Sequence, residues 1–248
     1  MLEAVEHTVN SKFKGRLVLK KLKTSSLLSG ALITLATLSF ATSAFTQKVS
    51  ELAQNTAKYA ANTYQKEMVA SLAELVKYNT VAIEGVKSTD NPEHIAFKQA
   101  LKKQAKDLGL DFQDYGYVII IGLGESKERV GIITHGDIQP VNPAKWAKSP
   151  FELDTTTEPG KLIARGTEDD KGPISTVLYA MKAIKDKNIA LTKRLELYVY
   201  MAEESDWGPL EEYVRHNELP QINITTDAEY PVVTAEKGYG TLKIAFNK

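Results

Sequence analysis

The residues of this sequence best suited to chemistry are four carboxylates and one histidine that follow short apolar segments. The segments 130–134, 194–201 and 223–226 are typical of buried β-strands. The residues just after them are His135, Asp137, Glu203, Glu204 and Asp227. Ligands bind at the carboxyl ends of strands in open α/β sheets, so we expect these side chains to lie close together.

A second group of acids lies in the segment 165–173, whose sequence is Arg-Gly-Thr-Glu-Asp-Asp-Lys-Gly-Pro. Glu168, Asp169 and Asp170 would stand at the start of a predicted helix. Packed carboxylates repel one another unless cations neutralise them or protons are taken up. A pair of divalent ions is the simplest neutraliser, and imidazole with carboxylate suits zinc, manganese or cobalt.

Each part of this pattern also has an ordinary interpretation. A His-Gly-Asp sequence is usually a turn, a pair of glutamates is usually the solvated start of a helix, and Asp227 could be a turn residue. Acids at a helix start complement the helix dipole and cap free N–H groups. Convergence of four such groups on one sheet edge favours a metal site. The sequence around His7, His94 and His216 indicates no ligand role.

Composition narrows the possible ligands and partners. The chain has 248 residues, 31 basic and 31 acidic side chains, and no cysteine. Balanced charge gives no support for nucleic-acid binding, which usually needs a basic excess or stripe. The lack of cysteine excludes disulfides, thiolate zinc sites and a cysteine nucleophile, so a metal must be held by His, Asp and Glu.

The predicted elements alternate between helix and strand. Apolar periodicity predicts helices in 47–77, 91–109, 173–185 and 209–216. Strands are predicted at 115–121, 130–134, 161–164, 194–201, 223–226 and from 240 to 246. This order predicts an α/β fold, a three-layer sandwich with a mostly parallel central sheet.

The N-terminal segment has the pattern of a secretory signal peptide. Six basic residues lie in 12–23, an uncharged apolar stretch covers 27–45, and the segment 41–44 (Ala-Thr-Ser-Ala) offers small residues for cleavage. We therefore expect export to the periplasm or beyond. The alternative is an uncleaved membrane anchor, because the stretch approaches the length needed to span a bilayer.

The sequence resembles a known enzyme family over residues 65–248. It is similar to the co-catalytic zinc metallopeptidases of clan MH, which include aminoacylase, glutamate carboxypeptidase, succinyl-diaminopimelate desuccinylase and carnosinase, and most of all to the bacterial dipeptidase V type. The order and spacing of several short motifs carry the resemblance. They are Thr-His-Gly-Asp at 134–137, Trp146, Pro-Phe at 150–151, the acidic segment 165–173, Glu-Glu-Ser-Asp-Trp at 203–207, and 227–232 running into 236–238.

The resemblance implies a two-zinc site. His135 and Asp227 would bind the first zinc ion, Glu204 would bind the second, and Asp169 would bridge both. Manganese or cobalt could replace zinc. The family's last zinc ligand is a histidine in the far C-terminal part of its catalytic domain, and no histidine follows His216 in this sequence.

The resemblance also implies the residues that assist the metals. Asp137 would orient the imidazole of His135, which fits the general pairing of histidine ligands with carboxylates. Glu203 would be the general base and acid acting on the water between the metals. The peptide bond Asp169–Asp170 would be cis.

These features predict the domain organisation and the activity. Residues 1–46 would be the signal peptide with its preceding basic segment, 47–236 the N-terminal part of a zinc-peptidase catalytic domain, and 237–248 the incomplete start of a lid domain. The full protein would hydrolyse dipeptides, with a small peptide as its partner and no stable membrane association after cleavage. The alternatives are hydrolysis of N-acyl amino acids and a non-catalytic fragment with an incomplete metal site.

Overall fold

The computed structural model describes residues 49–228, 233–235, 238 and 244. The predicted signal peptide or anchor, most of the predicted strand 240–246 and most of the predicted lid start lie outside the described residues. Among the helices in the described part, none is long and apolar enough to cross a bilayer.

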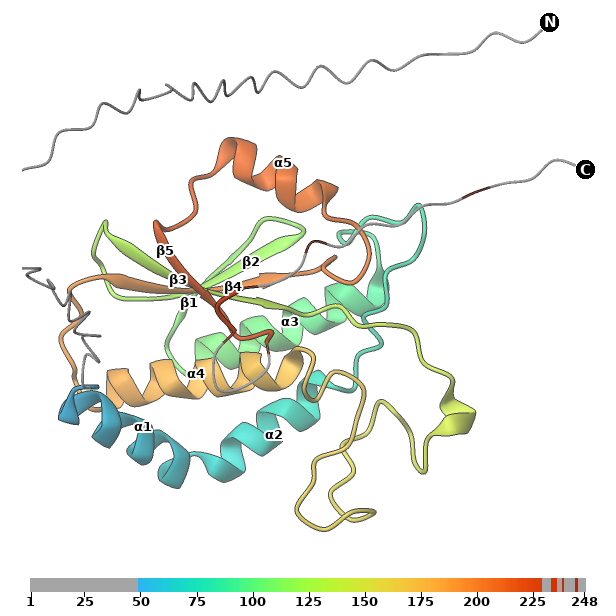
Figure 1. Cartoon of the computed structure of the whole chain (residues 1–248), viewed down its shortest axis with the longest axis horizontal. Coiled ribbons are helices and arrows are strands. Elements are labelled where there is room, and N and C mark those ends of the chain that lie inside the picture. The colour runs from blue at the N-terminus through green and yellow to red at the C-terminus, as the bar shows by residue number, and fades with distance from the viewer. Residues whose placement is uncertain (1–48, 229–232, 236–237, 239–243, 245–248) are drawn as a thin grey trace, which may run out of the picture. The chain divides into compact units, whose positions relative to one another are not determined.

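Five described strands form one sheet (Figure 1). They are β1 Asp111–Asp114, β2 Val118–Leu123, β3 Arg129–His135, β4 Arg194–Tyr200 and β5 Ile222–Thr225, and their order across the sheet is β1-β2-β4-β3-β5. β3 pairs in parallel with both β4 and β5. The carboxyl ends of β3, β4 and β5 therefore lie at the same edge of the sheet, as expected for the residues that follow the three predicted strands.

The described sheet contains one strand, β2, that runs against the other four. β1 pairs antiparallel with β2, and β2 pairs antiparallel with β4. The hairpin arises at Gly116, whose φ of 87° suits glycine in a tight turn. The predicted strand 161–164 is wrong, because only an isolated bridge joins Asp154 to Ile163.

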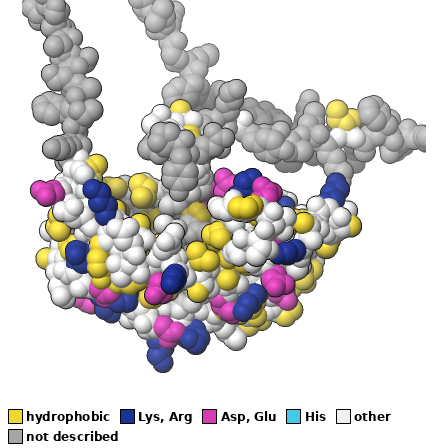
Figure 2. All heavy atoms as spheres, turned by 90° about the horizontal axis from the view of Figure 1, so that it is seen from below, with side chains coloured by type: hydrophobic (Ala, Val, Ile, Leu, Met, Phe, Trp, Pro, Cys, Tyr) yellow, Lys and Arg dark blue, Asp and Glu magenta, His cyan; other side chains and the backbone are white. Residues whose placement is uncertain are grey.

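Helices cover both faces of the sheet, which confirms the α/β three-layer architecture. Figure 1 shows α1–α4 on one side and α5 on the other. The helices are α1 Glu51–Thr63, α2 Gln65–Leu75, α3 Pro92–Asp107, α4 Lys171–Asp186 and α5 Gly208–His216, with a short 3₁₀ helix η1 at Pro143–Lys145. On the face seen in Figure 2, basic and acidic side chains are intermingled.

The predicted helix 47–77 is broken into α1 and α2 at Tyr64. The hydroxyl of Tyr64 donates a hydrogen bond to the carboxylate of Asp186 at the end of α4. Both α1 and α2 pack against α4. The start of α3 is as predicted, with Asn91 as its N-cap.

Alternate side chains of the central strands build two separate cores. Ile119 and Ile121 of β2 and Leu197 of β4 pack with the α3 and α4 side chains, including Phe97 and Leu178. The intervening side chains of the same strands face α5 and join a second cluster, which contains Val118, Ile120, Tyr198 and Tyr200. Because both faces are packed, the ends of β3 and β4 are fixed in position.

Candidate metal centre

His135 is the last residue of β3 and its side chain is 1% exposed. Its ring Nδ1 lies 3.0 Å from the backbone carbonyl oxygen of Asp137. A carbonyl only accepts, so Nδ1 carries the hydrogen in the neutral ring and Nε2 carries the lone pair. The backbone N–H of His135 donates to Asp170 Oδ2 at 3.2 Å, which fixes the end of the strand.

The lone pair of His135 Nε2 faces two carboxylates. Nε2 lies 2.8 Å from Asp169 Oδ1 and 3.5 Å from Asp227 Oδ2. Although buried, Nε2 makes no hydrogen bond of acceptable geometry. Two ligands each ~2.0–2.1 Å from a tetrahedral zinc ion lie about 3.3 Å apart. Each of the two distances from Nε2 is near that spacing, and the three residues whose possible ligand atoms lie within 4.8 Å of one another are His135, Glu203 and Asp227.

Asp169 reaches this position from the loop before α4. The Asp169–Asp170 peptide bond is cis, as the family resemblance implies. Asp170, the neighbouring acid, is buried and directed at β3 instead of at the site. Burial raises the pKa of Asp170 to about 8, and one of its oxygens has no hydrogen-bond partner among the described residues.

Glu203 and Glu204 lie in a turn after β4. Glu203, His135 and Asp227 each place one potential ligand atom within 4.8 Å of the others. Glu204 Oε2 accepts a hydrogen bond of 2.7 Å from Gln139, and its buried Oε1 has no hydrogen-bond partner in the described part of the chain. The turn therefore brings both glutamates to the edge where His135 ends β3.

The electrostatics of the cluster favour a bound cation. Burial is the largest cause that raises the pKa of Glu203 and of Glu204, and neighbouring carboxylates raise both further. For His135, burial lowers the pKa, but Asp137, Asp170 and Asp169 outweigh it and bring the pKa to about 10. The surroundings thus stabilise positive charge at this imidazole, and a divalent cation would supply that charge in place of the proton.

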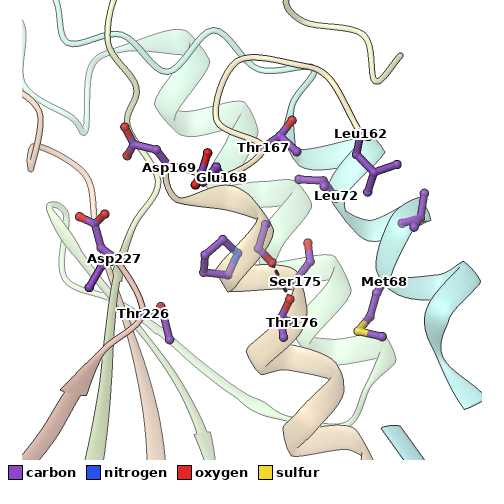
Figure 3. A pocket seen from close by; sticks show the side chains of 14 residues that line it. Met68, Leu72, Leu162, Thr167, Glu168, Asp169, Ser175, Thr176, Thr226 and Asp227 are labelled. Atoms are coloured by element: carbon purple, nitrogen blue, oxygen red, sulfur yellow. Dashed lines mark hydrogen bonds between the residues drawn. The ribbon is translucent and has the colours of Figure 1, made fainter. Parts of the chain in front are cut away.

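A cavity of about 640 Å³ adjoins the cluster. Figure 3 shows Asp169 and Asp227 on one side of it and Met68, Leu72 and Leu162 on the other. The carboxylates therefore border a space with an apolar wall, an arrangement common in small-molecule sites.

The predicted residues differ in how directly the structure brings them together. His135, Glu203 and Asp227 converge, and Asp169 Oδ1 lies 2.8 Å from His135 Nε2. Glu204 lies beside Glu203 in the turn whose N–H groups donate to Asp137. Sequence reasoning missed Gln139, which donates a hydrogen bond to Glu204, and the role of Asp170, which accepts the backbone N–H of His135. Asp170 adjoins a predicted ligand, but its partner is a backbone N–H that no sequence motif reveals.

Comparison with protein families identifies the segment that carries these residues. Residues 131–238 match the family described as peptidase family M20/M25/M40. The chain is also 33% identical over 143 residues to a beta-Ala-Xaa dipeptidase from Lactobacillus delbrueckii subsp. lactis. The matched segment covers 57% of this chain and 30% of that relative.

Two solved structures have a similar fold. Human carnosine dipeptidase 1 has a TM-score of 0.55 and 25% identity, covering 66% of this chain and 38% of that protein. An M20 family metallo-carboxypeptidase from Sulfolobus solfataricus has a TM-score of 0.54 and 27% identity, and the match covers 65% of this chain and 37% of that protein. The chain spans only 26–40% of the length of the curated relatives it matches. These matches confirm the resemblance and the fold inferred from the sequence.

Proposed function

We propose that this protein is a metal-dependent dipeptidase, since residues 131–238 match peptidase family M20/M25/M40. One observation carries the proposal. The buried Nε2 of His135 faces Asp169 and Asp227 at 2.8 and 3.5 Å without making a hydrogen bond. A relative that matches over 57% of the chain is named a dipeptidase, which supports a small peptide as the substrate.

The site would hold two zinc ions. His135, Asp169 and Asp227 would hold one ion, and Asp169 would share the second with Glu204. Bound divalent ions supply two kinds of chemistry here, a lower pKa for water and polarisation of the substrate carbonyl. Asp169 suits a bridging role because its side chain is 48% exposed and borders the cavity.

Glu203 would carry the proton during hydrolysis. Its carboxylate would take a proton from water as the water oxygen bonds to the amide carbon. The same proton would then pass to the leaving nitrogen as the carbon–nitrogen bond breaks. The pKa of Glu203 is raised, first by burial, which moves this group toward the range where it can both accept and donate a proton.

Exchanging the two adjacent glutamates for glutamines tests these assignments. Glu203→Gln should retain bound metal and lose turnover by ~100- to 10,000-fold, the usual range for general base catalysis. Glu204→Gln should instead weaken one metal site. The measurements are elemental analysis and initial rates of dipeptide hydrolysis by the full-length protein. If the two variants behave the other way round, the roles of Glu203 and Glu204 are exchanged.

A third variant tests the metal number and the substrate class. Asp169→Ala should lose both ions because this carboxylate would contact both, and retention of two ions would refute the bridging role. The wild-type enzyme should cleave dipeptides faster than N-acetyl amino acids at equal concentration. A preference for the N-acetyl amino acids would identify an amidohydrolase instead.

A further inference from the structure

Asp137 occupies a position that neither metal binding nor proton transfer explains. Its carboxylate is fully buried. Oδ1 accepts the backbone N–H of Glu203 and Oδ2 accepts that of Glu204, each at 3.0 Å. Hydrogen bonds to an ionised acceptor are roughly twice as strong as neutral ones, so two consecutive N–H groups on one carboxylate form a firm attachment.

The same carboxylate is less well placed to hold the imidazole of His135. Asp137 Oδ1 lies 3.7 Å from His135 Nδ1, beyond hydrogen-bond range. The atom at hydrogen-bond distance from Nδ1 is the backbone carbonyl oxygen of Asp137, at 3.0 Å. The main chain therefore supplies the hydrogen bond to the ring, while the carboxylate, which lies beside the ring, accepts the N–H groups of the turn after β4.

We propose that Asp137 is a positioning residue for Glu203 and Glu204, fixing their turn relative to the end of β3. This inference rests on the proposed dipeptidase function. β4 ends at Tyr200, so strand pairing does not place the two glutamates. Asp137 supplies that placement, and Gln139, two residues further on, adds hydrogen bonds to the carbonyl and carboxylate of Glu204.

The physical reason for an anchor is the precision that the two glutamates need. Glu203 and Glu204 lie in a turn beyond the last paired residue of β4, and their backbone N–H groups are held by Asp137. A displacement of about 1 Å in a catalytic group can reduce turnover by ~100-fold.

The test is a double-mutant cycle between Asp137 and Glu203 in the full-length enzyme. Asp137→Asn keeps one acceptor oxygen but places an NH₂ group against the other backbone N–H, so it should loosen the turn. We expect a fall in kcat of ~100-fold with KM changed little. In a Glu203→Gln background the same change should cost little more, because residues that act as a unit are strongly non-additive.

Asp206→Asn is the matched control. Asp206 Oδ1 accepts the N–H of Gly208 at 2.9 Å, an exposed contact in the same loop that does not involve either glutamate. This variant should retain wild-type kcat. If the fold-losses of kcat in the two single variants multiply in the double mutant, the proposal is overturned. A loss of kcat in Asp206→Asn as large as in Asp137→Asn would also overturn it.

Hydrogen exchange in the wild-type protein gives a test that needs no variant to fold. The amides of Glu203 and Glu204 should exchange slowly because both donate to a buried carboxylate, and exchange at the rate of an unprotected turn would overturn the proposal. The proposed function fails by a different result. If Glu203→Gln alone leaves dipeptide hydrolysis intact, the base is wrong, whatever the exchange rates show.

Discussion

Replacing Gly172 with alanine should damage the metal centre through the backbone. Gly172 lies in the first turn of α4, where an added Cβ would be 2.1 Å from the carbonyl oxygen of Thr167. Ordinary carbon–oxygen contacts are about 3.3 Å or longer, so the two segments must separate by about 1 Å. The loop that would have to move carries Asp169, which projects toward His135.

Two magnitudes follow from this displacement. Forcing an extra carbon into a packed site costs ~1–3 kcal/mol of the free energy of unfolding. A shift of about 1 Å in Asp169 should also reduce kcat/KM by ~100-fold, since catalytic geometry tolerates little error. The assays are urea denaturation, zinc titration and dipeptide hydrolysis with the full-length protein.

Gly208→Ala provides the matched control at the start of α5. Its added Cβ would be 3.2 Å from Asp206 Oδ1, which belongs to a side chain that can move. We expect little change in stability or activity from this variant. If Gly172→Ala retains wild-type stability and zinc affinity, the close approach of α4 to the 167–170 loop does not hold Asp169.

Two further predictions concern the scaffold. Asn91→Ala should lower the free energy of unfolding by ~2 kcal/mol, because the buried Asn91 side chain caps α3 and donates a 3.1 Å hydrogen bond to the Val81 carbonyl. Asn142→Ala, which removes an exposed cap, should cost under ~1 kcal/mol. Equal losses for the two variants in urea denaturation would refute this prediction. Burial lowers the pKa of His94 in the folded protein. As the pH falls, this histidine is therefore protonated first in the unfolded chain, which favours unfolding. The free energy of unfolding should decline below pH ~6.5 by at most ~1.4 kcal/mol per pH unit. His94→Gln should flatten that decline between pH 7.5 and 5.5, and an unchanged slope would contradict the assignment.

The sequence allowed prediction of the site because its chemistry depends on strand ends. His135 and Asp227 could be placed by the apolar segments before them, and parallel pairing of β3 with β5 brought them together. The family resemblance supplied their roles. The turn that holds Glu203 and Glu204 could not be foreseen, since its backbone N–H groups bond to a carboxylate 66 and 67 residues away.

Errors in the predicted fold have similar physical causes. β1 was missed because its sequence, Asp-Phe-Gln-Asp, offers one apolar residue and pairs only at the edge of the sheet. The break at Tyr64 has no glycine or proline to mark it, and depends on the contact of Tyr64 with Asp186. Both features are set by distant partners that local periodicity does not encode.

The position of β3 between β4 and β5 has a consequence for biosynthesis. Both neighbours of β3 come later in the chain, and 87 residues separate His135 from Ile222. At a synthesis rate of ~5–20 residues per second, β3 would wait roughly 4 to 17 s for its second partner. During that interval its unpaired edges would be open to other strands. The arrangement that gathers the ligands at one edge therefore exposes β3 to incorrect strand pairing until β5 has been synthesised.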